Sequence, residues 1–187
     1  MLKDLILKSR SYRRFHEDHK ISENELRDLI DLARFAPSAR NAQPLKYFLS
    51  FDEATNSGIF PHLAWAGYLT EWPGPEEGER PPAYIVILLD KEISDDQFCD
   101  DGIAIQTILL GAAEKGLGGC TIAAIDRKGL RKSLNIPEQY DILYVLAIGK
   151  PKEKVVLEEM KDGDFKYWRD EHGIHHVPKR SLDELIL

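Results

Sequence analysis

Cysteine is scarce in this chain of 187 residues: only Cys99 and Cys120 are present, and they do not form a C-x-x-C motif. That scarcity argues against a disulfide framework and against a zinc site built from cysteine. Long hydrophobic runs are missing as well, since no apolar stretch approaches the roughly 20 residues of a membrane span. The opening residues, MLKDLILKSR, hold too short an apolar stretch for a secretory signal. These absences predict a cytoplasmic protein without a membrane partner.

Basic charge is also in deficit. The chain has 25 Lys and Arg against 32 Asp and Glu, a formal net charge of −7. A general nucleic-acid binder needs a broad basic surface, so no nucleic-acid partner is expected. The three histidines near the C-terminus, His172, His175 and His176, have a permissive spacing for metal but no third-ligand pattern around them. They are interpreted as part of a solvated or hydrogen-bonding tail, and no metal site is predicted.

Common catalytic motifs are absent too. The glycine-rich residues 111–120 are not a Walker A loop, because Leu117 and Gly118 stand where Lys and Ser or Thr are required. They also run from a helix into a strand, the reverse of a dinucleotide-binding loop. No G-x-S-x-G elbow occurs, which leaves a serine hydrolase without support. No catalytic side chain is predicted.

The chain does contain helix and strand patterns over its whole length. Ser22 and Glu25 form a capping box ahead of apolar residues at helical spacing, and the continuously apolar AYIVILLD predicts a strand buried on both faces. The other predicted elements are helices over residues 2–6, 95–116 and 127–134 and strands over residues 47–51, 120–125 and 142–149. Residues 72–82 are predicted to be a loop, and the tail from residue 151 onward is polar and mixed, with no element predicted in it. Helices flank strands without regular βαβ alternation, which predicts an α+β fold in one domain, residues 1–187.

The longest predicted helix, residues 95–116, has apolar positions that wrap widely around its axis, so burial on more than one side is expected. Gly102 and Gly111 within it would allow another helix to approach closely.

Arginines cluster in one segment of this acidic protein, RSYRRF at residues 10–15. Arg10, Arg13 and Arg14 lie within it, Lys8 precedes it, and Asp4 is the only earlier acid. The rigid guanidinium fork matches a phosphate bidentately, which makes the segment a candidate anion site. The alternative is a solvated basic helix end.

A second polar segment, APSARNAQP at residues 36–44, follows the capped helix. It places a Ser, an Asn and a Gln in a proline-bounded loop before a strand. Taken alone, this is a loop with turn residues or a ligand-binding loop.

The two segments together resemble the nitroreductase family of flavin-dependent oxidoreductases. The shared order is RS-Y-R-R-F, a capped helix, APS-x-x-N-x-QP and a strand, followed by a long buried helix, GLGG leading into a strand, and KRSLDEL near the C-terminus. The resemblance covers essentially the whole chain. It implies a nitroreductase-like fold with a central, mainly antiparallel sheet flanked by helices, and an obligate homodimer with FMN at the interface.

The resemblance also assigns roles to residues. Arg10 and Ser11 would hold the phosphate or ribityl chain of FMN, and Arg13 would lie toward the phosphate or the pyrimidine edge of the flavin. Residues from the partner subunit and backbone amides near flavin N5 and O4 would complete the site. The full predicted cofactor-binding set is Arg10, Ser11, Arg13, Pro37, Ser38, Asn41, Ala123, Ala124, Lys179 and Arg180, with Pro37 and Ser38 from the partner and the amides from Ala123 and Ala124.

Three positions depart from the family pattern. Ser9 stands where many members have a first arginine, and Leu45 replaces the common Trp after QP. Ser181 stands at the proline of the closing motif, which leaves Lys179 and Arg180 as competing candidates for the phosphate.

The function predicted is an FMN-dependent oxidoreductase that takes hydride from NADH or NADPH and reduces a nitroaromatic, quinone or similar conjugated small molecule. Flavin carries the redox chemistry itself, which accounts for the missing triad and metal cluster. The alternatives are another flavin-dependent dehydrogenase or reductase on the same scaffold and a non-catalytic flavin-binding protein. Trp65, Tyr68 and Trp72 are candidates for the pocket cover or for ordinary packing.

Overall fold

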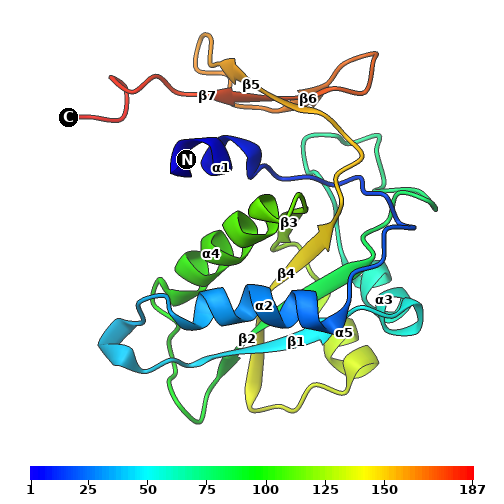
Figure 1. Ribbon diagram of the computed structural model, residues 1–187, viewed down its shortest axis with the longest axis vertical. Helices are drawn as coiled ribbons and strands as arrows, with labels where there is room; N and C mark the ends of the chain where they lie inside the picture. Colours follow the sequence, from blue (N-terminus) through cyan, green and yellow to red (C-terminus); the bar gives the residue numbers. More distant parts are fainter.

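A computed structural model describes residues 1–187. Its main sheet has four antiparallel strands in the order β1-β2-β4-β3 (Figure 1). These strands are β1 (Leu45–Ser50), β2 (Ala83–Asp90), β3 (Gly118–Ile122) and β4 (Tyr140–Gly149). The helices are α1 (Leu2–Lys8), α2 (Glu23–Arg34), α3 (Glu53–Ile59), α4 (Asp100–Glu114) and α5 (Arg127–Leu134), with short 3-10 turns at Ala39–Asn41 and Phe60–His62. The predicted α+β class and antiparallel sheet are confirmed.

Strand β2 explains why the core has two halves. All eight of its side chains are buried, and alternate residues point to opposite faces of a strand. Tyr84 and Val86 belong to one apolar cluster, with Phe15 and Ile59, while Ile85 belongs to the other. The second cluster contains Leu26 and Leu29 of α2 and Ile108 of α4, so these helices cover one face of the sheet, and α3 with α5 lies on the other (Figure 1).

Helices α2 and α4 pack closely at Gly111. A Cβ atom added there would lie 2.5 Å from Leu32 Cδ1 and 3.2 Å from Leu29 Cδ2. The predicted close approach is therefore confirmed at Gly111. At Gly102 nothing lies within 4 Å of such an atom. The predicted close approach of another helix of the same chain is therefore wrong at Gly102.

The start of α4 was predicted wrongly. The helix begins at Asp100 and not at residue 95, since Phe98 has a positive φ of 52°. The Asp96 carboxylate accepts a hydrogen bond from the backbone N–H of Phe98 at 2.8 Å. An Asp that binds the backbone two residues on forms a turn in competition with a helix.

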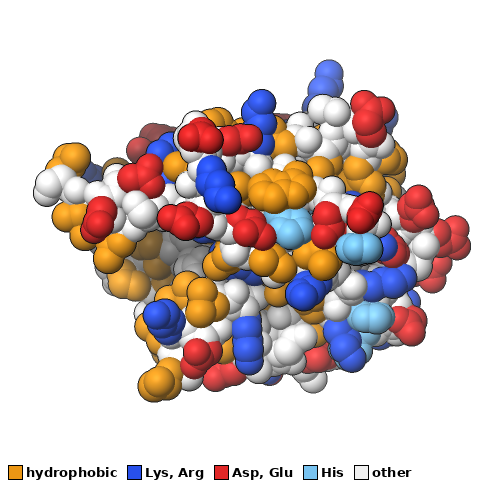
Figure 2. All heavy atoms as spheres, turned by 90° about the horizontal axis from the view of Figure 1, so that it is seen from above, with side chains coloured by type: hydrophobic (Ala, Val, Ile, Leu, Met, Phe, Trp, Pro, Cys, Tyr) orange, Lys and Arg blue, Asp and Glu red, His pale blue; other side chains and the backbone are white.

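The polar end of the chain forms a second sheet, which was not predicted. Strands β5 (Val155–Glu159), β6 (Trp168–Arg169) and β7 (His175–Lys179) form it, with β5 parallel and β6 antiparallel to the central β7. Helix α1 lies between this small sheet and α4 (Figure 1). The outer face of the sheet carries charged side chains of both signs around hydrophobic and histidine side chains (Figure 2).

One further prediction needs correction, and one helix was not predicted. Strand β3 ends at Ile122, so Ala123 and Ala124 follow the strand and lie outside it. Helix α3 was not predicted; Asp52 caps it by accepting from the Thr55 N–H at 2.8 Å. Helix α5 matches its predicted bounds.

No helix combines the length and the hydropathy needed to cross a membrane.

Candidate functional site

The arginine segment lies along the exposed edge of β3. Ser11 forms a parallel bridge with Gly119, and the Tyr12 N–H donates to the Gly119 carbonyl at 3.0 Å. Phe15 ends the segment fully buried in the core. A Cβ atom on Gly118 would lie 2.5 Å from Tyr12 Cδ2, so the glycines of the GLGG turn give the segment room to approach. The chain is thereby extended between α1 and Phe15, with Arg10 and Arg13 on the side of the small sheet.

A cavity of about 380 Å³ opens beside this segment. The arginine segment forms one wall, α4 and β3 form the second, and β7 together with Tyr167, just before β6, forms the third. Its lining residues are Ser9, Arg10, Ser11, Arg13, Ile105, Gln106, Leu109, Thr121, Tyr167, His175, Val177 and Lys179. Three of them are cations and none is a carboxylate. In a protein of net charge −7, that concentration of positive charge favours an anion.

Arg13 is held by side chains of the small sheet. Its Nη1 lies 3.2 Å from His175 Nε2 and donates to the Ser11 carbonyl at 3.3 Å. Its guanidinium carbon lies 4.9 Å from the centroid of the Tyr167 ring, a cation–π contact. The guanidinium is thus fixed at the cavity wall.

Glu153 holds the backbone of the same segment. Its side chain is only 1% exposed, and Oε1 accepts hydrogen bonds from the backbone N–H groups of Arg13 and, at 3.2 Å, Arg14. Its Oε2 pairs with Arg169 Nη2 at 3.1 Å. One buried carboxylate therefore ties the arginine segment to β6.

Arg14 points away from the cavity. It makes a bidentate ion pair with Glu79, at 2.5 and 2.6 Å. The hydrogen bond from Arg14, aided by Lys152, lowers the pKa of Glu79 to about 2. Arg14 therefore has a structural partner of its own.

Strand alternation distinguishes Lys179 from Arg180. Along β7, His175, Val177 and Lys179 line the cavity, whereas His176 faces the other side. Arg180 follows the strand, and its Nη1 lies 3.4 Å from Glu184 Oε1 on the surface. Of the two candidates, the structure brings only Lys179 to the arginines.

The histidines of β7 have opposite environments. His175 is 1% exposed, and burial, together with the charges of Arg13, Arg169 and His176, lowers its pKa to about 4. His176 lies 2.7 Å from Glu158 Oε1 and 3.2 Å from Asp170 Oδ2, and these hydrogen bonds raise its pKa. Of the two predicted descriptions of the tail, hydrogen bonding fits His175 and His176, and His175 is buried and not solvated.

Four buried polar side-chain atoms have no hydrogen-bond partner: Arg10 Nε, Arg169 Nε, His175 Nδ1 and Trp65 Nε1. Arg10 and His175 line the cavity, and Arg169 pairs with His175 in the sheet register. The arginine and tryptophan atoms can only donate. A buried donor without an acceptor is costly, and an oxygen-rich anion in the cavity would supply an acceptor for Arg10 Nε, whereas Arg169 and Trp65 do not line the cavity. The residues present thus fit a phosphate group.

The other predicted site residues lie elsewhere in the single chain. Pro37 and Ser38 line a separate hollow of about 270 Å³, where the Ser38 hydroxyl donates to Asp100 Oδ2 at 2.6 Å. Asn41 has a positive φ of 56° in the loop that follows. Ala123 and Ala124 are exposed and do not line the arginine cavity.

Trp65, Tyr68 and Trp72, the candidates for a pocket cover, all pack against other side chains. The rings of Tyr68 and Tyr167 are 5.0 Å apart at their centroids, and Arg169 lies 4.5 Å over the Trp72 ring. Trp65 is buried in the core. Tyr68 and Trp72 therefore contact residues at and beside β6, and Tyr68 packs against Tyr167, which lines the cavity.

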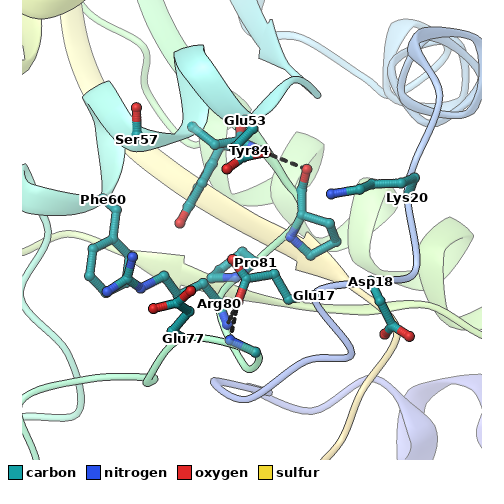
Figure 3. Close-up of a pocket in the computed structure, with 13 residues that line it drawn as sticks. Glu17, Asp18, Lys20, Glu53, Ser57, Phe60, Glu77, Arg80, Pro81 and Tyr84 are labelled. Carbon is teal, nitrogen blue, oxygen red and sulfur yellow. Dashed lines mark hydrogen bonds between the residues drawn. The ribbon is translucent and has the colours of Figure 1, made fainter.

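A hollow on another side of the molecule has a different character. It has a volume of about 550 Å³, and acidic side chains such as Glu53 and Glu77 line it together with Lys20 and Arg80 (Figure 3). Glu17 accepts hydrogen bonds from the backbone N–H groups of residues 78 and 80 there (Figure 3). Its four acidic side chains, Glu17, Asp18, Glu53 and Glu77, outnumber Lys20 and Arg80, so it lacks the excess of positive charge found in the arginine cavity.

Known proteins share the fold of this chain. The chain is similar to a solved structure described as an FMN-dependent nitroreductase from Clostridium difficile R20291, with 26% identity, a TM-score of 0.65, and coverage of 80% of this chain and 87% of that one. A nitroreductase family protein from Streptococcus pneumoniae TIGR4 shares the fold over 100% of this chain and 99% of its own, with a TM-score of 0.70 and 16% identity. The fold is thus that of a class of oxidoreductases, the nitroreductases.

The family follows from the sequence. A profile of the Nitroreductase family matches residues 6–150, and the chain belongs to that family. It is 27% identical over 157 residues to an Archaeoglobus fulgidus protein provisionally named NADH dehydrogenase/NAD(P)H nitroreductase, covering 80% of this chain and 85% of that protein. The small sheet, beginning at Val155, lies beyond the matched residues.

Sequence reasoning missed Glu153, Tyr167 and His175 in the site. No motif contains them, and the polar segment around them gives no periodic signal. Only the pairing of β7 with its neighbours brings them to the arginines. The one available signal was the two adjacent histidines before the basic closing segment.

Proposed function

We propose that the protein is an FMN-dependent oxidoreductase that takes hydride from NADH or NADPH and passes electrons to a nitroaromatic, quinone or similar conjugated acceptor. The observation that carries the proposal is the cavity with three cations, no lining carboxylate and unsatisfied buried donors. Family membership supports FMN as the occupant, since the relative from Clostridium difficile is described as FMN-dependent.

The residues of the cavity would bind the phosphate end of this cofactor. Arg10 and Lys179 would contribute charge, Ser11 a hydroxyl and Arg13 a planar fork, and charge-assisted hydrogen bonds of this kind are the strong ones. When bound, FMN would supply the hydride chemistry of the reaction. The protein would orient the ring and place Arg13 near charge that develops during reduction. No side-chain acid or base is required by this scheme.

A homodimer is the second part of the proposal. Pro37 and Ser38 line a hollow separate from the arginine cavity, so in one chain the predicted halves of the site are apart. Helix α1, which borders the cavity, buries none of its own residues and leaves Leu2 and Leu7 exposed. A second copy would cover such apolar surface and bring Pro37 and Ser38 to the cofactor.

The test begins with the purified protein. It is expected to be yellow, to release FMN and not FAD or riboflavin on denaturation, and to oxidise NADH or NADPH in the presence of a quinone. Light scattering of the holoprotein is expected to give the mass of two chains. A colourless protein that takes up no added FMN would refute the proposal. Tight flavin binding without turnover with any acceptor would instead favour the non-catalytic alternative.

A further inference from the structure

We propose that His175 is a positioning residue: its Nε2 lone pair fixes the Arg13 guanidinium in the orientation that binds the cofactor. This inference rests on the proposed function and concerns a residue outside the part of the chain that matches the family profile. The observation behind it is the 3.2 Å contact between Arg13 Nη1 and His175 Nε2.

The contact determines which nitrogen of His175 carries the proton. A guanidinium has donors only and stays protonated, so Nε2 must accept. The proton of the neutral ring is then on Nδ1, the buried atom that has no partner. A protonated ring would instead present a donor to a donor, and the contact with Arg13 would be lost.

Burial maintains the neutral ring. His175 is 1% exposed, and this burial, together with the charges of Arg13, Arg169 and His176, lowers its pKa to about 4. Arg13 and His175 both contact Tyr167, with ring centroids of Tyr167 and His175 5.1 Å apart. The guanidinium is therefore restrained by a hydrogen bond from one side chain and a ring face from another. A restrained side chain loses less freedom when it binds a ligand.

Substitutions can separate the acceptor from the bulk of the side chain. His175→Leu keeps an apolar volume but offers Arg13 no acceptor, whereas the amide oxygen of His175→Gln can replace Nε2. The matched control is His176→Leu, one residue along β7 on the opposite face, where the ring bonds Glu158 and Asp170 and does not line the cavity.

The experiment is a titration of each full-length apoprotein with FMN, followed by quenching of flavin fluorescence, together with the apoprotein melting temperature. His175→Leu is expected to weaken FMN binding about tenfold, the effect of one charge-assisted hydrogen bond. His175→Gln is expected to bind within about threefold of the wild type. His176→Leu is expected to lower the melting temperature and leave FMN affinity unchanged.

A double-mutant cycle identifies the route of the effect. If His175 acts through Arg13, His175→Leu has no further effect on FMN affinity in an Arg13→Ala background, because the group it positions is gone. Additive losses in the double variant, or an equal loss in His176→Leu, would overturn the inference while leaving the proposed function intact. A wild-type apoprotein that binds no FMN would overturn both. If His175→Leu does not fold, His175→Asn, whose shorter amide does not reach Nη1, takes its place in the cycle.

Discussion

Replacing Arg10 by alanine tests whether the cavity holds a phosphate. Arg10 already donates from Nη2 to the Ile6 carbonyl at 2.7 Å, and its buried Nε has no partner. An anion in the cavity would accept from this free donor. Hydrogen bonds to charged groups contribute roughly 1.5–3 kcal/mol each. One lost bond therefore lowers FMN affinity by about 10- to 150-fold.

The assay compares two flavins at one ionic strength. Apoprotein is titrated with FMN and, in parallel, with riboflavin, which has the same ring but no phosphate. Arg10→Ala is expected to weaken FMN binding by the factor above and riboflavin binding by less than about threefold, because only FMN presents the anion. Raising the salt concentration should reduce the preference for FMN in the wild type more than in the variant.

Arg14→Ala is the matched control, since it removes the same charge four residues along the segment. Arg14 binds Glu79 away from the cavity, so FMN affinity should hardly change. Its ion pair with Glu79 is partly buried. Loss of the pair should lower the free energy of unfolding by about 2 kcal/mol, a value between those measured for exposed and for fully buried ion pairs. Equal losses of FMN affinity in the two variants would refute the assignment, and so would equal losses for both flavins in Arg10→Ala.

Further predictions concern stability. The pKa of Glu79 is about 2, below its ordinary 4.5, so its stabilising effect is complete above pH about 4.5 and is lost as the pH falls toward 2. Over that pH range the urea midpoint of Glu79→Gln should fall less than that of the wild type. The pKa of His176 is raised above 6.5, so its stabilising effect is present below pH 6.5 and is lost as the pH rises through the raised value. His176→Gln should remove that alkaline decline in urea titrations. Gly111→Ala places a Cβ atom against α2 and should lower the free energy of unfolding by about 1–3 kcal/mol. The Cβ atom of Gly102→Ala enters open space, so this variant should raise the free energy of unfolding slightly in urea titrations of both variants. A larger loss of unfolding free energy at Gly102 than at Gly111 would contradict the packing described.

Local signals predicted the elements that are governed by local chemistry. Three elements agree with their sequence patterns: the helix capped at Ser22, the continuously buried β2 and helix α5. They could be predicted because capping and burial depend on the residue types within a short segment. The early start predicted for α4 failed since the acids before Asp100 form a turn that competes with the helix.

Tertiary contacts were beyond the reach of such signals. The arginine segment was found because three guanidinium groups on an acidic chain are unusual. Its partners Glu153, Tyr167 and His175 are single residues in a polar stretch, and only strand pairing brings them to it. The choice between Lys179 and Arg180 likewise required the alternation of β7.

Glu153 also imposes an order on biosynthesis. The backbone of Arg13 and Arg14 is held by this carboxylate and by a bridge between Phe15 and Pro151. A ribosome adds about 5–20 residues per second, so roughly 7–28 s separate the synthesis of Arg13 from that of Glu153, and β7 follows later. During that interval the arginines have neither their buried carboxylate nor β7. The proposed anion site is therefore complete only after the segment that carries Glu153 and β7 has been synthesised.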